Sequence, residues 1–230
     1  MLDRNQTIHF STGALLMPKL AYSFFQEPTI ALAKRLLGCE LVHQIGSKIL
    51  SGIIVETEAY LWKEDPASHA AIGETKRNLA MFGPAGCLYI YSIHNRYCLN
   101  ITSESSGRGA AVLIRGIEPT RGIETMSTLR PVLFLRELTR GPGNLCQAFG
   151  IDLNLNGESL FKSERIWLES SPGIPDLPIR TTTRIGISQA KDLQLRFFVD
   201  GSPFVSGRAS DHSLKRDRFL GTTLEKVSTR

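Results

Sequence analysis

Five stretches rich in β-branched and aromatic residues constrain the fold of this chain most strongly. They occupy residues 40–44, 49–58, 87–93, 97–102 and 110–115. Runs of this length and composition are typical of β-strands. Short connections, such as Gly46-Ser47 between the first two runs, favour antiparallel pairing of neighbours. The first half of the chain therefore predicts an antiparallel sheet.

Helical segments are predicted around and after these strands. Residues 28–38 form an amphipathic stretch that admits Pro28 in the first turn and ends at Gly38, and residues 141–149 begin at a Gly-Pro turn. The remaining expectations are helical turns at 122–126 and 132–138, a linker at 170–178, and final strands at 183–187 and 195–199. Strands followed by helices in one chain of 230 residues predict a single α+β domain. We expect this domain at 24–207, between a flexible segment at 1–23 and a basic tail at 208–230.

Composition narrows the classes of protein to consider. Lys and Arg number 27 against 22 Asp and Glu, which gives a net charge of +5 and suits a polyanionic partner without requiring one. The four cysteines occur singly, so neither a zinc site nor a disulfide framework is predicted. A leader for export and a membrane span are also not expected, because no apolar run approaches about 18 residues. These features favour a reduced, cytoplasmic protein.

The segment Glu56-Thr57-Glu58-Ala59-Tyr60 is the most informative for chemistry. In a strand, alternate residues share one face, so both carboxylates and the ring should point the same way. Two carboxylates in proximity raise one pKa, which suits general acid–base hydrolysis. A solvated strand end that carries charge is the alternative. The spacing does not decide whether Glu56 or Glu58 would be the base.

Four further residues are candidates for a binding site. His69 and Tyr91 could join Tyr60 in walls that hold an unstacked base, although aromatic residues on strands more often pack in a core. Asn100 lies in an apolar strand and could read a base edge or bond the backbone. Arg115 follows an apolar run at a predicted strand end, where it could orient a carboxylate or phosphate, or form a surface ion pair.

A series of short blocks in order along the chain resembles the alkyladenine (3-methyladenine) DNA glycosylase family in its bacterial form. The resemblance covers residues 24–207. The blocks are Glu56-Thr57-Glu58-Ala59-Tyr60, Asp65-Pro66-Ala67-Ser68-His69-Ala70, Lys76-Arg77-Asn78, Met81-Phe82-Gly83-Pro84-Ala85-Gly86, Tyr89-Ile90-Tyr91, Cys98-Leu99-Asn100, Leu113-Ile114-Arg115-Gly116-Ile117-Glu118-Pro119, residues 141–148, Arg184-Ile185-Gly186 and residues 196–206. Each block alone is modest, but about ten in the same order are specific.

The resemblance implies an α+β fold with a curved antiparallel sheet surrounded by helices and a β-hairpin that inserts into DNA. It also implies no metal or cofactor, double-stranded DNA with damaged purines as partner, and no membrane or obligate protein partner. The implied reaction is hydrolysis of the N-glycosidic bond of alkylated purines such as 3-methyladenine and 7-methylguanine, and of deaminated ones such as hypoxanthine, in the nucleoid. With no lysine in a matched catalytic position, the implied product is an abasic site.

The resemblance also assigns roles to individual residues. Glu58 matches the general base, and Arg115 and the main-chain carbonyl of Ile185 match groups that position the attacking water. The base pocket is matched by Tyr60, His69, Tyr91 and Asn100, of which Asn100 would crowd the 2-amino group of guanine.

One departure concerns the hairpin, which in the family carries a tyrosine that fills the gap left by the flipped nucleotide. Here the segment reads Ile93-His94-Asn95-Arg96-Tyr97 and is one residue shorter than the usual pattern. His94 is the nearest match to this wedge, with Arg96 beside it as a minor-groove contact. A noncatalytic binder of damaged DNA and a hydrolase of free nucleosides are therefore kept as alternative functions.

Overall fold

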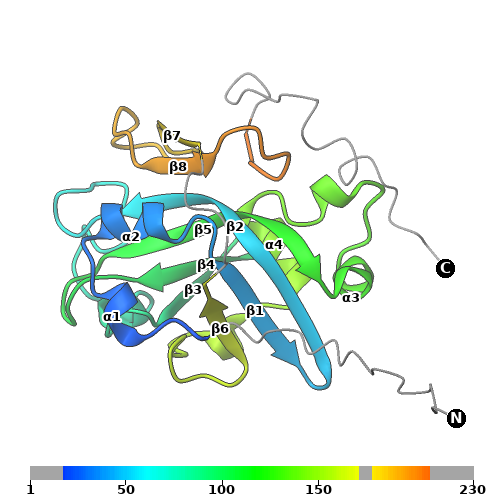
Figure 1. The fold of residues 1–230 in the computed structure, drawn as a ribbon. Coiled ribbons are helices and arrows are strands. Elements are labelled where there is room, and N and C mark those ends of the chain that lie inside the picture. The colour runs from blue at the N-terminus through cyan, green and yellow to red at the C-terminus, as the bar shows by residue number, and fades with distance from the viewer. Residues whose placement is uncertain (1–17, 171–177, 208–230) are drawn as a thin grey trace, which may run out of the picture.

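The computed structural model describes residues 18–170 and 178–207, which form one α+β domain (Figure 1). A curved antiparallel sheet has the strand order β3-β4-β5-β2-β1-β6, with β8 attached to β2 and β7 attached to β8. The strands are β1 Glu40–Ile45, β2 Lys48–Tyr60, β3 Leu88–Ile93, β4 Arg96–Thr102, β5 Ala111–Arg121, β6 Ile166–Glu169, β7 Ile179–Thr182 and β8 Arg196–Val199. The predicted fold class is confirmed.

The long strand β2 organises the sheet because it changes partner along its length. Its first half pairs with β1, from Lys48 to Ile53, and its second half pairs with β8, from Glu56 to Glu58. Strand β5 runs along the other side of both halves, with register shifts on either side of Glu56. Such bulges bend a strand and increase its twist. In Figure 1, β8 and β7 accordingly extend the sheet from the second half of β2, away from β1.

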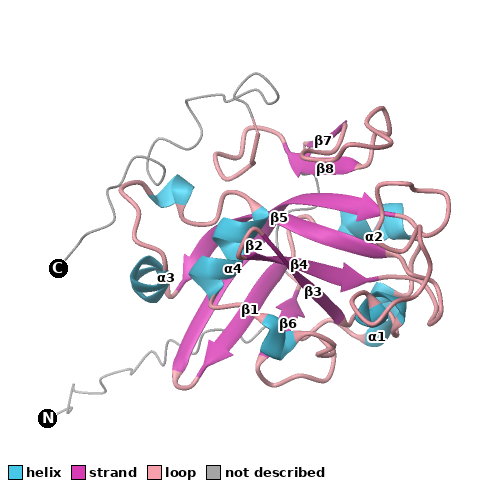
Figure 2. Cartoon of the chain, turned by 180° about the vertical axis from the view of Figure 1, so that it is seen from behind, coloured by secondary structure: helices cyan, strands magenta, loops and turns pink. Residues whose placement is uncertain are grey.

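Short helices surround this sheet, as the view from behind shows (Figure 2). They are α1 Tyr22–Phe25, α2 Thr29–Arg35, α3 Ile123–Leu129 and α4 Pro142–Phe149, with 3₁₀ turns η1 Leu79–Phe82, η2 Leu135–Glu137 and η3 Leu153–Leu155. Helix α4 begins at Pro142 and is followed by Gly150, which has a φ of 64°. This left-handed conformation favours glycine at a helix end. No helix in the two described ranges has the length and apolar character needed to cross a bilayer.

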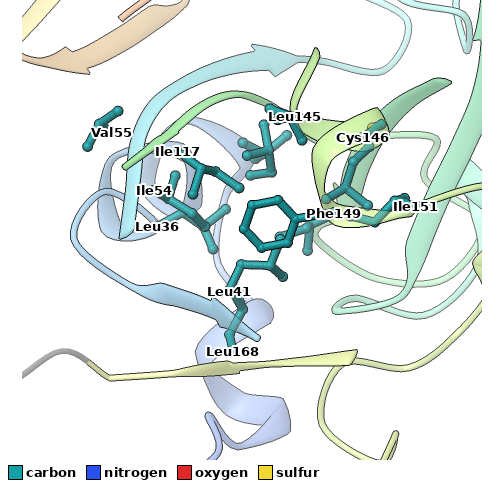
Figure 3. Packing of buried hydrophobic residues seen from close by; sticks show 14 of the residues in the cluster. Leu36, Leu41, Ile54, Val55, Ile117, Leu145, Cys146, Phe149, Ile151 and Leu168 are labelled. Atoms are coloured by element: carbon teal, nitrogen blue, oxygen red, sulfur yellow. The ribbon is translucent and has the colours of Figure 1, made fainter. Parts of the chain in front are cut away.

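The main hydrophobic core lies between α4 and the sheet. Phe149 is fully buried, and Figure 3 shows its ring among Leu41, Ile54 and Leu145. Leu168 of β6 closes this cluster at the end opposite α4 (Figure 3). The core therefore fixes α4 against the strands that carry the site described below.

Several sequence expectations about individual elements were wrong. Residues 183–187 are an irregular loop, since the final pair of strands is β7 and β8. Gly186 in this loop has a φ of 78°, which a regular strand does not accommodate. Strand β5 continues to Arg121, because the first half of β2 offers it a partner, so Arg115 lies within a strand and not at its end. Only the turn η2 is helical in 132–138, and strand β6 was not foreseen.

Other expectations about elements were confirmed within a few residues. The helices predicted at 28–38, 122–126 and 141–149 correspond to α2, α3 and α4. The expected tail at 208–230, most of the first segment and most of the linker at 170–178 lie outside the described residues.

Replacement of Phe149 by alanine should destabilise the domain by about 3–5 kcal/mol, because it removes a fully buried ring and leaves a cavity. Chemical denaturation followed by circular dichroism measures this change. The matched control is Leu133→Ala, because Leu133 is 74% exposed. Loss of its side chain should cost less than about 0.5 kcal/mol. Similar losses for both variants would contradict this description of the core.

Candidate active site

A cavity of about 420 Å³ opens between the sheet and two loops, at residues 61–69 and 183–189. Its size lies within the range of about 300–1,000 Å³ that is usual for small-molecule sites. The lining residues are Tyr60, Pro66, Ala67, His69, Met81, Tyr89, Tyr91, Ile93, Cys98, Asn100, Leu113, Arg115, Pro142 and the residues from Ile185 to Gln189. Rings and apolar side chains make up much of this wall, with few charges.

Glu58 lies in β2 with no exposed surface, and three groups hold its carboxylate. The hydroxyl of Tyr60 donates to Oε2 at 2.9 Å and Arg115 Nη1 donates to the same oxygen at 3.3 Å. The main-chain N–H of Ile185 donates to Oε1 at 2.8 Å. Tyr60, Arg115 and Ile185 all line the cavity, so the carboxylate lies directly behind its wall.

Burial is the main influence on the acidity of Glu58. It raises the pKa above the ordinary value of 4.5, whereas the charge of Arg115, the N–H of Ile185 and the hydroxyl of Tyr60 lower it. The neighbouring charge of Glu56 also raises the pKa, but it is the smallest of these influences. The expected effect of the carboxylate pair is therefore present but minor, and the low-polarity surroundings cause most of the shift.

Glu56 is also fully buried, but its carboxylate is bound by a different set of groups. Its Oε1 accepts hydrogen bonds from Arg196 Nε at 2.7 Å and Ser206 Oγ at 2.9 Å, and its Oε2 accepts one from the N–H of Ser206 at 2.7 Å. Arg115 Nε lies 3.4 Å from Oε1, so one guanidinium joins both carboxylates. The alternative of a solvated strand end is wrong for both residues, because the interior of the protein surrounds them.

The three aromatic candidates lie around the cavity as the sequence analysis expected. His69 is exposed and meets Tyr91 edge to face, with ring centroids 4.5 Å apart. Its Nδ1 is 2.8 Å from the hydroxyl of Tyr89, a buried residue that was not among the predicted site residues. Alternation of Tyr89 with Tyr91 along β3 was the available indication. Although the residue as a whole is exposed, partial desolvation of its ring and the charge of Arg77 lower the pKa of His69, which favours the neutral ring at neutral pH.

Asn100 faces the same cavity from β4 and is 3% exposed. Its Nδ2 donates to the carbonyl of Tyr89 at 2.9 Å and to that of Cys98 at 3.3 Å. Backbone bonding, one of the two roles considered for this residue, therefore accounts for both amide hydrogens. The two bonds also fix the orientation of the amide at the cavity wall.

The connection between β3 and β4 is a two-residue turn. His94 has a φ of 47° and Asn95 a φ of 59°, as the type I′ turns of tight hairpins require. Ile93 and Arg96 form the closing pair. Ile93 is 48% exposed and lines the cavity, whereas His94 lies at the exposed tip outside the lining. Ile93 was not among the predicted site residues, although it is an apolar residue next to a polar turn.

Arg96 extends from the hairpin to the start of α4. Its Nη1 donates to Asn144 Oδ1 at 2.9 Å, and its aliphatic stem lies so close to Gly143 that a Cβ at that position would come within 2.8 Å of it. Helix α4 therefore supports the hairpin from one side. Within residues 18–170 and 178–207, no cluster of His, Cys, Asp and Glu side chains is suited to hold a metal ion.

Comparisons with a family model and with individual proteins all indicate the same family. The model of the family described as methylpurine-DNA glycosylase matches residues 23–203. A Chlorobaculum tepidum protein named "Putative 3-methyladenine DNA glycosylase" is 48% identical over 192 residues, which cover 83% of this chain and 91% of the relative. A Rhodopirellula baltica protein of the same name is 43% identical, with 86% and 87% covered. The human DNA-3-methyladenine glycosylase is 42% identical, with 87% and 72% covered.

The raised pKa of Glu58 predicts a pH-dependent stability difference between the wild type and Glu58→Gln. A carboxyl whose pKa is raised on folding stabilises the protein fully below its unfolded value, near 4.5, and this contribution is lost as the pH rises through the folded pKa. Glutamine does not titrate, so the melting temperature of Glu58→Gln minus that of the wild type should increase above pH 4.5. Thermal unfolding between about pH 4 and 8 measures it, and a constant difference would contradict the prediction.

Proposed function

The chain belongs to the methylpurine-DNA glycosylase family and is a hydrolase of N-glycosyl bonds in DNA, and we propose that it acts on a damaged purine turned out of the duplex into the cavity. Family membership gives base excision repair of DNA as its function, with 3-methyladenine in the names of its relatives.

One observation most strongly supports Glu58 as the general base: its carboxylate is held by three groups that all line the cavity. A carboxylate of raised pKa is a stronger proton acceptor, and Arg115 favours its ionised form at neutral pH. Glu56 is not held by the cavity wall in this way, because both of its carboxylate oxygens accept hydrogen bonds from Arg196 and Ser206. We therefore assign Glu58 as the general base.

The proposed reaction is hydrolysis at C1′ of the damaged nucleotide. The bond from C1′ to the purine nitrogen breaks and its electron pair leaves with the base, while a water oxygen bonds to C1′ and gives a proton to Glu58. A carboxylate next to the sugar also stabilises the positive charge that develops on it. Arg115 and the carbonyl of Ile185 would position the water, and the N–H of Ile185 holds Glu58 itself.

Tyr60, His69 and Tyr91 are proposed to hold the flipped base by stacking and hydrogen bonds. Alkylated purines such as 3-methyladenine and 7-methylguanine suit this site because their positive charge makes them good leaving groups, and hypoxanthine is a further substrate of the proposal. Asn100 would crowd the 2-amino group of guanine, a role supported by the two bonds that fix its amide.

The product is proposed to be a free abasic site. A lyase that cuts the strand forms a Schiff base with an amine. Among the described residues no lysine lines the cavity, which supports simple hydrolysis.

The β3–β4 hairpin is proposed to enter the minor groove of double-stranded DNA, with His94 in the wedge position and Arg96 as a groove contact. Its two-residue turn places His94 at the tip and leaves Ile93 exposed at the mouth of the cavity. Apolar side chains inserted between base steps are a common means of kinking DNA. Ile93 is therefore proposed to share the insertion with His94.

Replacement of Glu58 by glutamine should lower the single-turnover release of 3-methyladenine from duplex DNA by about 10²–10⁴-fold, because the group that accepts the proton is lost. Lesion binding, measured by fluorescence anisotropy, should persist. Glu56→Gln is the matched control: it disturbs the network of Arg196 and Ser206 and should lower the melting temperature, with less effect on release by the folded protein.

The same assays address the two alternative functions. Tight lesion binding without release at high wild-type concentration would favour a noncatalytic binder of damaged DNA. Release that is indifferent to duplex context and to added salt would favour a hydrolase of free nucleosides. Equal loss of release in Glu56→Gln and Glu58→Gln would overturn the assignment of the base.

His94→Tyr and Ile93→Ala test the hairpin. A larger ring at the wedge should fill the gap in the duplex better and slow dissociation from abasic DNA, whereas loss of the exposed apolar side chain should speed it. Dissociation rates from a fluorescent abasic duplex give both effects, with Ile179→Ala, an exposed residue of β7, as control. Unchanged rates in both hairpin variants would show that neither residue inserts.

A further inference from the structure

A buried ion pair lies behind the cavity and joins the loops at residues 61–69 and 183–189. Arg184 donates through both terminal nitrogens to Asp65: Nη2 lies 2.7 Å from Oδ1, and Nη1 bonds to Oδ2. Neither side chain has any exposed surface. A bidentate geometry of this kind fixes both the distance and the orientation of the two partners.

The same guanidinium is also attached to the end of β2. Nη1 donates to the carbonyl of Ala59 at 3.0 Å, and the group lies over the Tyr60 ring at 4.6 Å from its centroid. Asp65 in turn accepts the N–H of Leu61 at 3.2 Å and that of Ala67 at 3.1 Å. One ion pair therefore joins three parts of the site: the end of β2, the loop that carries His69, and the loop that begins at residue 183.

Arg184 directly precedes Ile185, whose N–H donates to Glu58. The loop at 183–189 has no regular secondary structure to hold this N–H in place. The Arg184 side chain therefore anchors this loop, whose backbone is not held by a helix or a strand. Neither Asp65 nor Arg184 lines the cavity, so neither would touch a base bound there.

We propose that Asp65 and Arg184 are positioning residues. Their ion pair holds the Ile185 N–H against the Glu58 carboxylate, and it also keeps the Tyr60 ring in place at the cavity wall. The inference rests on the proposed role of Glu58. It adds a specific dependence: when the pair is lost, the carboxylate loses a fixed hydrogen-bond donor even if the domain stays folded.

The test uses the full chain in four variants, with a readout that does not depend on activity. Asp65→Asn and Arg184→Gln each leave one buried charge without its partner, so both should lower the melting temperature strongly. The double variant removes both charges and should recover most of this stability. Arg184→Lys keeps the charge without the bidentate, planar geometry and serves as the conservative variant.

Titration of Glu58 followed by NMR of ¹³C-labelled glutamate, assigned with Glu58→Gln, is the deciding measurement. Because a hydrogen bond to the ionised carboxylate lowers its pKa, the loss of the Ile185 donor should raise the pKa of Glu58 further in the double variant. Single-turnover base release should fall on the order of 10- to 100-fold, as expected for a misplaced catalytic group. Arg184→Lys should change both quantities in the same direction.

Phe149→Leu is the control for a general loss of stability, since it lies in the core away from the cavity and should leave the titration of Glu58 unchanged. A double variant that recovers stability and also keeps the wild-type titration would overturn the inference; where that variant does not fold, a wild-type titration in Arg184→Lys would do so. Failure of the wild type to release any base would count against the proposed function alone, because the titration is read without substrate.

Discussion

The structure depends on the compensation of charges buried at one end of the sheet. Glu56, Glu58 and Asp65 have no exposed surface, and Arg115, Arg184 and Arg196 are at most 7% exposed. Removing a carboxylate from water costs several kcal/mol unless a close partner and further hydrogen bonds compensate it. Three guanidinium groups pair with these three carboxylates and meet this requirement.

The bend of β2 brings these charges together. Near Glu56 the strand leaves β1, takes β8 as its new partner and shifts its register against β5. This change brings Arg196 of β8 and Arg115 of β5 to the same side of β2 as Glu56. A straight β2 that kept β1 as its partner along its whole length would not bring Arg196 and Arg115 together beside Glu56. The buried network is thus a consequence of topology as much as of residue type.

The two carboxylates of β2 illustrate how surroundings separate chemically identical groups. Glu56 accepts three hydrogen bonds from Arg196 and Ser206 and serves to hold the segment around Ser206. Glu58 is held by groups that themselves form the cavity wall, and burial raises its pKa. Keeping such a group buried reduces stability at neutral pH, as is common where a protein maintains a reactive site.

The sequence was sufficient to predict the fold class, the positions of most strands, three of the helices and some of the residues that line the cavity. Alternation along β2 correctly placed Glu56, Glu58 and Tyr60 on one side, because this pattern depends only on local backbone geometry. Strand β6 and the length of β5 could not be predicted in this way, since each is stabilised by a distant partner in the sheet.

Only the tertiary structure distinguished the surroundings of Glu56 from those of Glu58, made Arg115 a buried link between them, and paired Asp65 with Arg184. These contacts join residues from 57 to 150 positions apart, and no local pattern encodes them. The sequence placed a charged motif at the end of an expected strand. The motif does end β2, at Tyr60, but the fold buries both of its carboxylates. Burial, and with it the raised pKa of Glu58, comes from the elements that pack around β2.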